Sequence, residues 1–241
     1  MLLFIVFSAI IVVVENRENT LTGPQREIIL NEHNKLRSRL AFGTIKNRDD
    51  IYMPTAKNML EVIWNKKLDT IAQGLASADA KHTLIAHTVG MNVFRYRSFG
   101  EDNIENFIIH AISASLGNWT SELNYRYENN PENKYTSDII KQRASSFAQM
   151  AWGKTHEIGC GIAVNMERFG RSAVFVCLYK PCGKKKNELI YELGAPCKDD
   201  SDCDDGKCLK ESGLCRKKKQ NQLISLFRIL CSCQQSVEGD H

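Results

Sequence analysis

The sequence predicts an α+β fold: a three-layer α-β-α sandwich with an antiparallel sheet, followed by a small disulfide-rich module. Three observations support this prediction. Four segments carry apolar residues at helical spacing, residues 158–179 have the composition of a β-hairpin, and six of the nine cysteines lie between Cys177 and Cys215. Because helices on either side of the strands must bury their apolar faces against them, a layered domain follows.

A first helix is expected between Thr22 and Gly43. Thr22 and Gln25 form a capping box, and Pro24 occupies an early helical position. Helical spacing then relates Ile29, His33, Leu36 and Leu40. We expect His33 to be a packed residue of this helix and not a metal ligand.

A second helix is expected after Asn65, which acts as its N-cap. Residues 44–58 before it are a predicted loop, and an alternating pattern at residues 90–96 predicts a strand after it. The predicted apolar stripe of this helix is Trp64, Leu68, Ile71, Leu75 and Ala78.

Two further helices complete the layers. The third is capped within residues 102–105, and the fourth spans residues 137–150 and leads into the hairpin. A polar loop at residues 124–136 separates them. The predicted buried face of the third helix is Ile104, Phe107 or Ile108, Ala111, Ser115, Trp119 and Leu123.

The hairpin predicts a disulfide. If its turn is symmetric about Arg168 and Phe169, Cys160 falls directly opposite Cys177. Facing residues of antiparallel strands have Cα atoms about 4.5 to 5.5 Å apart, which a disulfide can span. We therefore expect a hairpin that is covalently closed between Cys160 and Cys177.

The amino terminus and the cysteines indicate export. Residues 1–14 are almost unbroken apolar, too short for a membrane span and typical of a secretory signal peptide, although no cleavage site stands out. Nine cysteines fit an oxidising compartment. We expect a secreted, extracellular protein with no integral membrane span once the signal is removed.

Charge and composition indicate the character of the basic runs, the cysteine-rich segment and the tail. The net charge is +4, and the basic runs at residues 184–186 and 216–219 are predicted to be solvated loop, because no aromatic residues interleave them. No nucleic-acid partner is therefore expected. Residues 182–215 form a polar cysteine-rich hinge module that disulfides must hold. For the basic, then apolar tail at residues 216–241, a short helix, a docking strand and a disordered tail stay open.

Six motifs follow one another along the chain: His33–Ser38, Trp64–Leu68, Trp119–Glu122, Phe147–Trp152, Ile158–Gly161 and Val176–Pro181. In this order they resemble the CAP superfamily (SCP/TAPS), which comprises sperm-coating, antigen 5 and plant pathogenesis-related 1 proteins. The resemblance covers a CAP domain at residues 22–181 and implies an α-β-α sandwich with a large central cleft. Residues 194–215 look like the cysteine hinge of nematode activation-associated secreted (ASP), venom allergen-like members.

The family's cleft carries two histidines and two glutamates that can hold a divalent metal. Carried over residue by residue, these positions are His82, Met91, Glu122 and Ser146, with His87 as the alternative to His82. A thioether and a hydroxyl are poor zinc ligands. The resemblance therefore implies that Zn²⁺ binding is weak or lost, and no cofactor is expected.

Two residues near this pattern stay open. Glu101, from a neighbouring loop, could supply the carboxylate that is missing at Met91. Cys182 stands where the family usually has a small residue, and we expect it to pair within the hinge.

These observations favour a secreted, non-enzymatic binding protein whose partner is an extracellular protein receptor or a lipid or sterol. The first alternative is a hydrolase that uses His82, Glu122 and Ser146. It requires an imidazole within about 3 Å of the hydroxyl, and the chain has no Gly-x-Ser-x-Gly elbow. The second alternative is a toxin or inhibitor module at residues 197–215, carried by the CAP domain.

Overall fold

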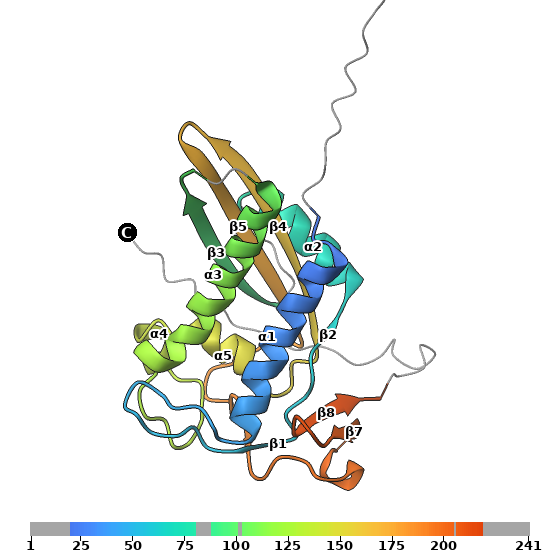
Figure 1. Ribbon diagram of the computed structural model, residues 1–241. Coiled ribbons are helices and arrows are strands. Elements are labelled where there is room, and N and C mark those ends of the chain that lie inside the picture. Colours follow the sequence, from blue (N-terminus) through green and yellow to red (C-terminus); the bar gives the residue numbers. More distant parts are fainter. Residues whose placement is uncertain (1–19, 81–87, 101–102, 205, 219–241) are drawn as a thin grey trace, which may run out of the picture.

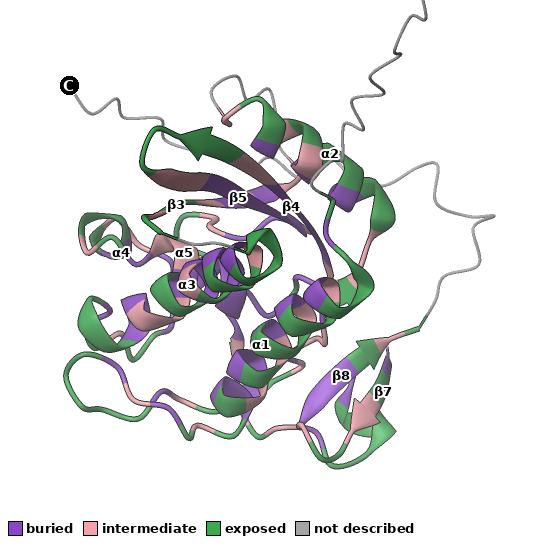
Figure 2. Ribbon diagram, turned by 45° about the horizontal axis from the view of Figure 1, so that its top comes forward, coloured by how far each residue is buried: buried purple, intermediate pink, exposed green. Residues whose placement is uncertain are grey.

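The computed structural model describes residues 20–80, 88–100, 103–204 and 206–218. In this part of the chain a central sheet lies between two layers of helices, as the sequence predicts (Figure 1, Figure 2). One face is covered by α2 (Lys66–Ser77), and the other by α1 (Gly23–Ala41), α3 (Ile104–Tyr125) and α5 (Ser145–Ala151).

Several predicted features lie outside the described residues. They are the signal peptide at residues 1–14, the tail from residue 219 onward, and His82, His87 and Glu101. Among the helices that the structure does describe, none combines the length and the apolar character needed to cross a bilayer.

The central sheet is mixed and not purely antiparallel. β3, β4 and β5 pair antiparallel, whereas the two-residue β2 runs parallel to the start of β4. The chain leaves β2 through α2 and returns to β4 only after several other elements, so no tight turn forces the two strands to run in opposite directions. The strand order is β2 (Ile63–Trp64), β4 (Glu157–Glu167), β5 (Gly170–Lys180) and β3 (Gly90–Ser98).

The first two helices begin where the sequence predicts. The Thr22 hydroxyl accepts a hydrogen bond from the Gln25 backbone N–H, and the Gln25 side chain accepts one from the Thr22 backbone, so the capping box is complete. The Asn65 side chain accepts from the N–H groups of Lys67 and Leu68 at the start of α2.

The buried face of α2 differs from the predicted stripe. Ile71 is 52% exposed, whereas Ala72 and Ala76 are buried against the sheet. The reason is close approach: a Cβ on Gly161 of β4 would collide with the backbone of Gln73. Where the helix backbone lies this close to a strand, only small residues fit at the contact, and the isoleucine turns to solvent.

The predicted fourth helix is two helices. α4 (Ser137–Lys141) ends before Arg143, whose φ of 56° is left-handed and stops the helical path, and α5 starts at Ser145. The Phe147 N–H in the first turn of α5 donates to the carboxylate of Glu122 on α3. Local sequence could not predict this break, because that hydrogen-bond acceptor comes from another helix.

The β4–β5 hairpin has the register deduced from a turn centred on Arg168 and Phe169. Glu167 pairs with Gly170 at the turn, and Cys160 faces Cys177 further along the strands. A disulfide joins the two cysteines, whose Cα atoms are 4.1 Å apart. The strands are longer than predicted and project beyond the helices (Figure 1).

The cysteine-rich segment packs against the main body of the fold. β1 (Ala56–Lys57) pairs with β6 (Glu192–Leu193), and the segment continues through η1 (Asp200–Asp202), β7 (Gly206–Leu209) and β8 (Leu214–Lys217). In β8, the Cys215 N–H donates to the Met59 carbonyl, and the Cys215 carbonyl accepts from the Glu61 N–H. β8 therefore lies against residues 59–61.

The hinge cysteines pair with one another, as Cys197–Cys208 and Cys203–Cys215. Cys182 is also disulfide-bonded, but to none of these four. The expectation that Cys182 pairs within the hinge is therefore wrong, because the two hinge disulfides leave it no partner there.

A buried arginine joins α1 to the loops beneath the sheet. Arg37 has no exposed surface, and its guanidinium donates to five backbone carbonyls at 2.7 to 3.0 Å. Burial lowers the pKa of Arg37 to about 9, so the group stays charged at neutral pH. The five acceptors belong to Leu60, Met150, Trp152, Gly153 and Thr155.

We expect Arg37→Lys to lower the free energy of unfolding by about 2 to 5 kcal/mol, because an ammonium has three donors and leaves buried carbonyls unpaired. Arg39→Lys, at an exposed position in the last turn of the same helix, should change it by less than about 0.5 kcal/mol. Urea unfolding of both variants measures the difference. Equal stabilities would show that the Arg37 contacts are dispensable.

Candidate functional site

The structure brings together two of the residues that the family resemblance assigns to the cleft. Glu122 lies on α3, and Ser146 lies in the first turn of α5, the helix that packs against α3. Glu122 is only 6% exposed. The candidate site is therefore the contact between these two helices on the α1–α3 face of the sheet.

The Glu122 carboxylate caps α5. One of its oxygens accepts from the Phe147 N–H at 2.8 Å, and Ser146 also hydrogen-bonds to it. Burial raises the pKa of Glu122, and the hydrogen bonds from Phe147 and Ser146 partly oppose this rise, as does the positive charge of Arg126. The carboxylate thus satisfies donors of the protein itself.

Met91 is separated from these two residues. In β3 it pairs with Leu178, and its side chain packs with Leu68 and Val176 on the α2 face of the sheet. Successive residues of a strand point to opposite faces, so it is Asn92 that reaches the α5 side, where it donates to the Ser146 carbonyl at 3.0 Å.

A lysine that the sequence analysis missed lies at this site. Lys184 is half-buried, and its ammonium donates to the Met91 carbonyl at 2.9 Å. Burial lowers the pKa of Lys184 to about 8, while the charge of Glu122 raises it. The interpretation of residues 184–186 as solvated loop is therefore wrong at its first residue. The sequence does not distinguish Lys184 from the neighbouring lysines, because the groups around it belong to β3 and α3, which are distant in the chain.

A buried hydrogen-bond chain supports the site from the α1 side. His33 Nδ1 is 2.7 Å from the Ile29 carbonyl, so Nδ1 donates and Nε2 accepts from the Tyr179 hydroxyl at 3.0 Å. Asn92 also donates to the Tyr179 hydroxyl, at 3.4 Å. Burial lowers the pKa of His33 to about 4, so His33 is neutral and packed, not a ligand.

The described residues of the predicted cleft do not fit a zinc centre. The Met91 side chain is across the sheet, Ser146 hydrogen-bonds to Glu122, and Glu122 accepts backbone N–H groups. The ammonium of Lys184 adds a positive charge that a divalent cation would have to approach. Zinc requires several converging nitrogen, oxygen or sulfur ligands, and this set supplies one partly engaged carboxylate.

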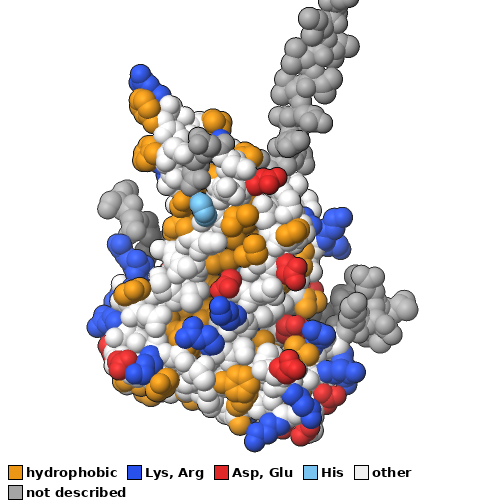
Figure 3. Space-filling model, in the orientation of Figure 1, with side chains coloured by type: hydrophobic (Ala, Val, Ile, Leu, Met, Phe, Trp, Pro, Cys, Tyr) orange, Lys and Arg blue, Asp and Glu red, His pale blue; other side chains and the backbone are white. Residues whose placement is uncertain are grey.

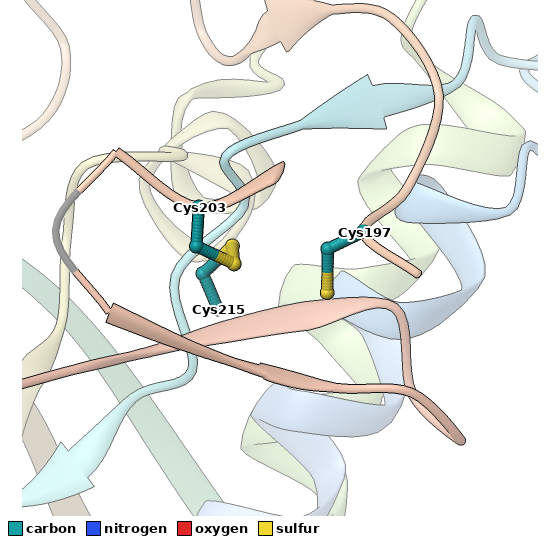
Figure 4. Close-up of side chains that lie close together, drawn as sticks. All are labelled: Cys197, Cys203 and Cys215. Carbon is teal, nitrogen blue, oxygen red and sulfur yellow. A yellow bond between two sulfur atoms is a disulfide. The ribbon is translucent and has the colours of Figure 1, made fainter. Parts of the chain in front are cut away.

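Outside the candidate site, three cysteine sulfur atoms lie as close together as the ligands of one metal ion would. The Sγ atoms of Cys197, Cys203 and Cys215 lie within 4.8 Å of one another (Figure 4). Each of them is in a disulfide, with Cys208 as the partner of Cys197. A disulfide sulfur carries no thiolate charge, so this cluster is a structural staple and not a metal site.

A surface pocket of about 440 Å³ opens where α1 and α3 meet the loop at residues 44–52. Its lining is polar, and three of its charged groups are in ion pairs: Lys46 with Asp50 at 2.8 Å, and Arg48 with Glu128 at 2.9 Å. Met91, Glu122 and Ser146, the described residues of the predicted cleft, do not line it. We assign it no role.

Sequence comparisons agree with the fold and the motifs. The model of the cysteine-rich secretory protein family, CAP, matches residues 30–179. Venom allergen 5 of Vespa mandarinia is 34% identical over 177 residues, which cover 71% of this chain and 82% of the wasp protein. Venom allergen 5 of Tityus serrulatus is 29% identical over 213 residues, which cover 85% of this chain but 47% of the scorpion protein. The chain thus spans about half the length of that relative.

Solved structures show the same architecture. BmVAL-1 is 44% identical, with a TM-score of 0.76, and the match covers 83% of this chain and 97% of that one. NaASP2, solved with Zn²⁺, is 26% identical, with a TM-score of 0.66 over 82% of this chain and 97% of its own. Na-ASP-1 is 25% identical, with a TM-score of 0.71 over 84% of this chain and 49% of its own.

The capping role of Glu122 predicts different effects for two substitutions. Glu122→Gln keeps an acceptor for the Phe147 N–H and removes a buried charge, so its free energy of unfolding at pH 7 should stay within about 1 kcal/mol of wild type. Glu122→Ala leaves the N–H unpaired and should lose about 2 kcal/mol or more. Because the folded-state pKa is raised, wild type should lose stability relative to Glu122→Gln as the pH rises through that pKa. Urea unfolding at pH 5 and pH 7 tests both points, and equal losses for the two variants would contradict the capping role.

The buried His33 predicts a loss of stability in acid. The folded-state pKa is about 4 and the ordinary value is 6.5, so between these values the unfolded chain binds a proton that the folded chain does not. The free energy of unfolding should therefore fall as the pH drops from 6.5 toward 4, with about 3 kcal/mol of this fall due to His33. His33→Gln should flatten the profile. Chemical unfolding across this pH range is the measurement; an unchanged slope in His33→Gln would refute the assignment.

Proposed function

Because the chain belongs to the cysteine-rich secretory protein (CAP) family, we propose that it is a secreted, non-enzymatic protein that binds a protein receptor outside the cell. The proposal rests on one observation: the polar groups of the candidate site are engaged with one another. Glu122 caps α5, Ser146 hydrogen-bonds to Glu122, and Lys184 binds the Met91 carbonyl. Because these groups are engaged within the protein, we expect the outer surface of the protein to bind the partner.

The arrangement gives little support to the hydrolase alternative. This alternative requires an imidazole within about 3 Å of the Ser146 hydroxyl. The Ser146 hydroxyl has Glu122 as its partner, and both ring nitrogens of His33 are occupied by Ile29 and Tyr179. His82, the remaining candidate base, lies outside the described residues.

The contacts of the cysteine-rich segment favour action together with the main body. Arg216 forms a two-point ion pair with Glu61 at 2.6 and 3.0 Å, and the Ser38 hydroxyl of α1 donates to the Ser212 carbonyl at 2.8 Å. A toxin or inhibitor module that the main body only carries would not need these contacts. We therefore treat the hinge as part of the binding scaffold.

We expect calorimetric titration of the full chain with Zn²⁺ to show no saturable one-to-one binding in the low micromolar range, because the described residues supply too few converging ligands. His82→Ala and Glu122→Gln should leave the trace unchanged. Stoichiometric binding in wild type that both substitutions remove would show that the cleft is a metal centre.

Receptor binding can be tested with labelled full-chain protein on intact cells. We expect saturable binding that trypsin treatment of the cells removes. Binding that survives trypsin, together with retention of a labelled sterol or fatty acid by the purified protein, would favour a lipid ligand instead. Esterase or protease activity that disappears in both Ser146→Ala and His82→Ala would overturn the non-enzymatic assignment.

A further inference from the structure

The β4–β5 hairpin ends in a projecting tip that the packing of the core does not require. Its strands extend past the ends of the helices, and the turn lies at Arg168 and Phe169 (Figure 1). The end of β3 lies beside this turn: a Cβ placed on Gly170 would be 3.0 Å from the Phe99 Cα and would collide with the Ser98 carbonyl. Three chain segments therefore meet at one end of the sheet.

This end carries three large apolar side chains in solvent. Phe99 is 70% exposed, Met166 is 74% exposed and Phe169 is 69% exposed. Single exposed apolar residues are ordinary on protein surfaces, but three at one projecting end of the sheet call for a physical role. Figure 3 shows hydrophobic and basic side chains together on the tip. We name Phe99, Met166, Arg168 and Phe169 the hairpin tip.

The charge of the tip is positive. The Arg168 guanidinium lies over the Phe169 ring, 5.1 Å from its centroid, and forms no ion pair with any carboxylate of the described residues. Behind it, Arg97 is 3.7 Å from Glu167, and Arg95 pairs with Asp79 at 3.4 Å. Glu167 is thus the described carboxylate at the turn and is close to Arg97, whereas Arg168 is not paired with a described acidic residue.

We propose that the hairpin tip docks on the surface of an anionic phospholipid bilayer. Phe99, Met166 and Phe169 enter the boundary between headgroups and acyl chains, and Arg168 binds lipid phosphates. A bilayer fits this shape better than a protein partner does. The tip is convex, and three such side chains present roughly 500 Å², less than the ~800 Å² per partner of a stable protein interface.

This inference goes beyond the proposed receptor binding, because the tip includes no residue of the candidate site. It assigns the protein a way to concentrate at a membrane surface. Separate experiments test the two proposals. Vesicle binding by the tip variants tests membrane docking, and the trypsin sensitivity of cell binding tests the protein receptor.

Co-sedimentation of the full chain with vesicles tests the proposal. Wild type should pellet with phosphatidylcholine vesicles that contain about a third phosphatidylserine, and less with pure phosphatidylcholine. The double variant Met166→Ser/Phe169→Ser should bind at least about 100-fold more weakly, since the burial of two large apolar side chains is lost. Arg168→Glu should abolish the preference for phosphatidylserine. Tyr125→Ser, which changes a 76% exposed side chain at the end of α3, is the matched control and should bind like wild type.

A fluorescent reporter placed in the tip gives an independent readout. Phe169→Trp should show a blue-shifted emission and quenching by brominated lipids when phosphatidylserine vesicles are added, and Tyr125→Trp should show neither. The proposal is overturned if wild type does not pellet with phosphatidylserine vesicles or if the double variant binds as wild type does. It is also overturned if the Phe169→Trp and Tyr125→Trp variants respond alike.

Discussion

The guanidinium of Arg37 is the interaction on which the rest of the arrangement depends. From α1 it donates hydrogen bonds to the backbone carbonyls of Leu60, Met150, Trp152, Gly153 and Thr155. These carbonyls belong to the entry of β2, the end of α5 and the approach to β4. Buried carbonyls need donors, and a planar group with five N–H bonds can serve five of them at once. The helix layer, the sheet and the loops beneath them are therefore fixed relative to one another.

The same rule, that buried polar groups must be paired, accounts for the candidate site. Glu122 is buried and meets its requirement through the first turn of α5. Lys184 is half-buried and meets part of its requirement through the Met91 carbonyl. These groups are committed to holding α3, α5 and β3 together, so little donor or acceptor capacity is left for a metal or a reaction. We propose that recognition takes place on the exterior instead, where the hairpin tip exposes apolar side chains.

The candidate site shows which of its residues a comparison of motifs can identify and which it cannot. The family resemblance assigns Glu122 and Ser146 to one cleft, and the structure places them in contact between α3 and the first turn of α5. Met91 was grouped with them by its place beside Asn92, but the side-chain alternation of β3 sends it to the other face of the sheet. Lys184 was overlooked because nothing in a run of three lysines distinguishes a half-buried one from the exposed Lys186.

The amino-acid sequence is enough to predict the helix starts at Thr22 and Asn65, the hairpin register and the pairing of Cys160 with Cys177. Each of these depends on residues near one another in the chain, on capping side chains or on a symmetric turn. The rotation of α2, the break before α5 and the parallel pairing of β2 depend on contacts formed in the folded chain. In each of these cases the deciding contact comes from a distant segment: the bare backbone of Gly161, the carboxylate of Glu122 and the return of the chain into β4.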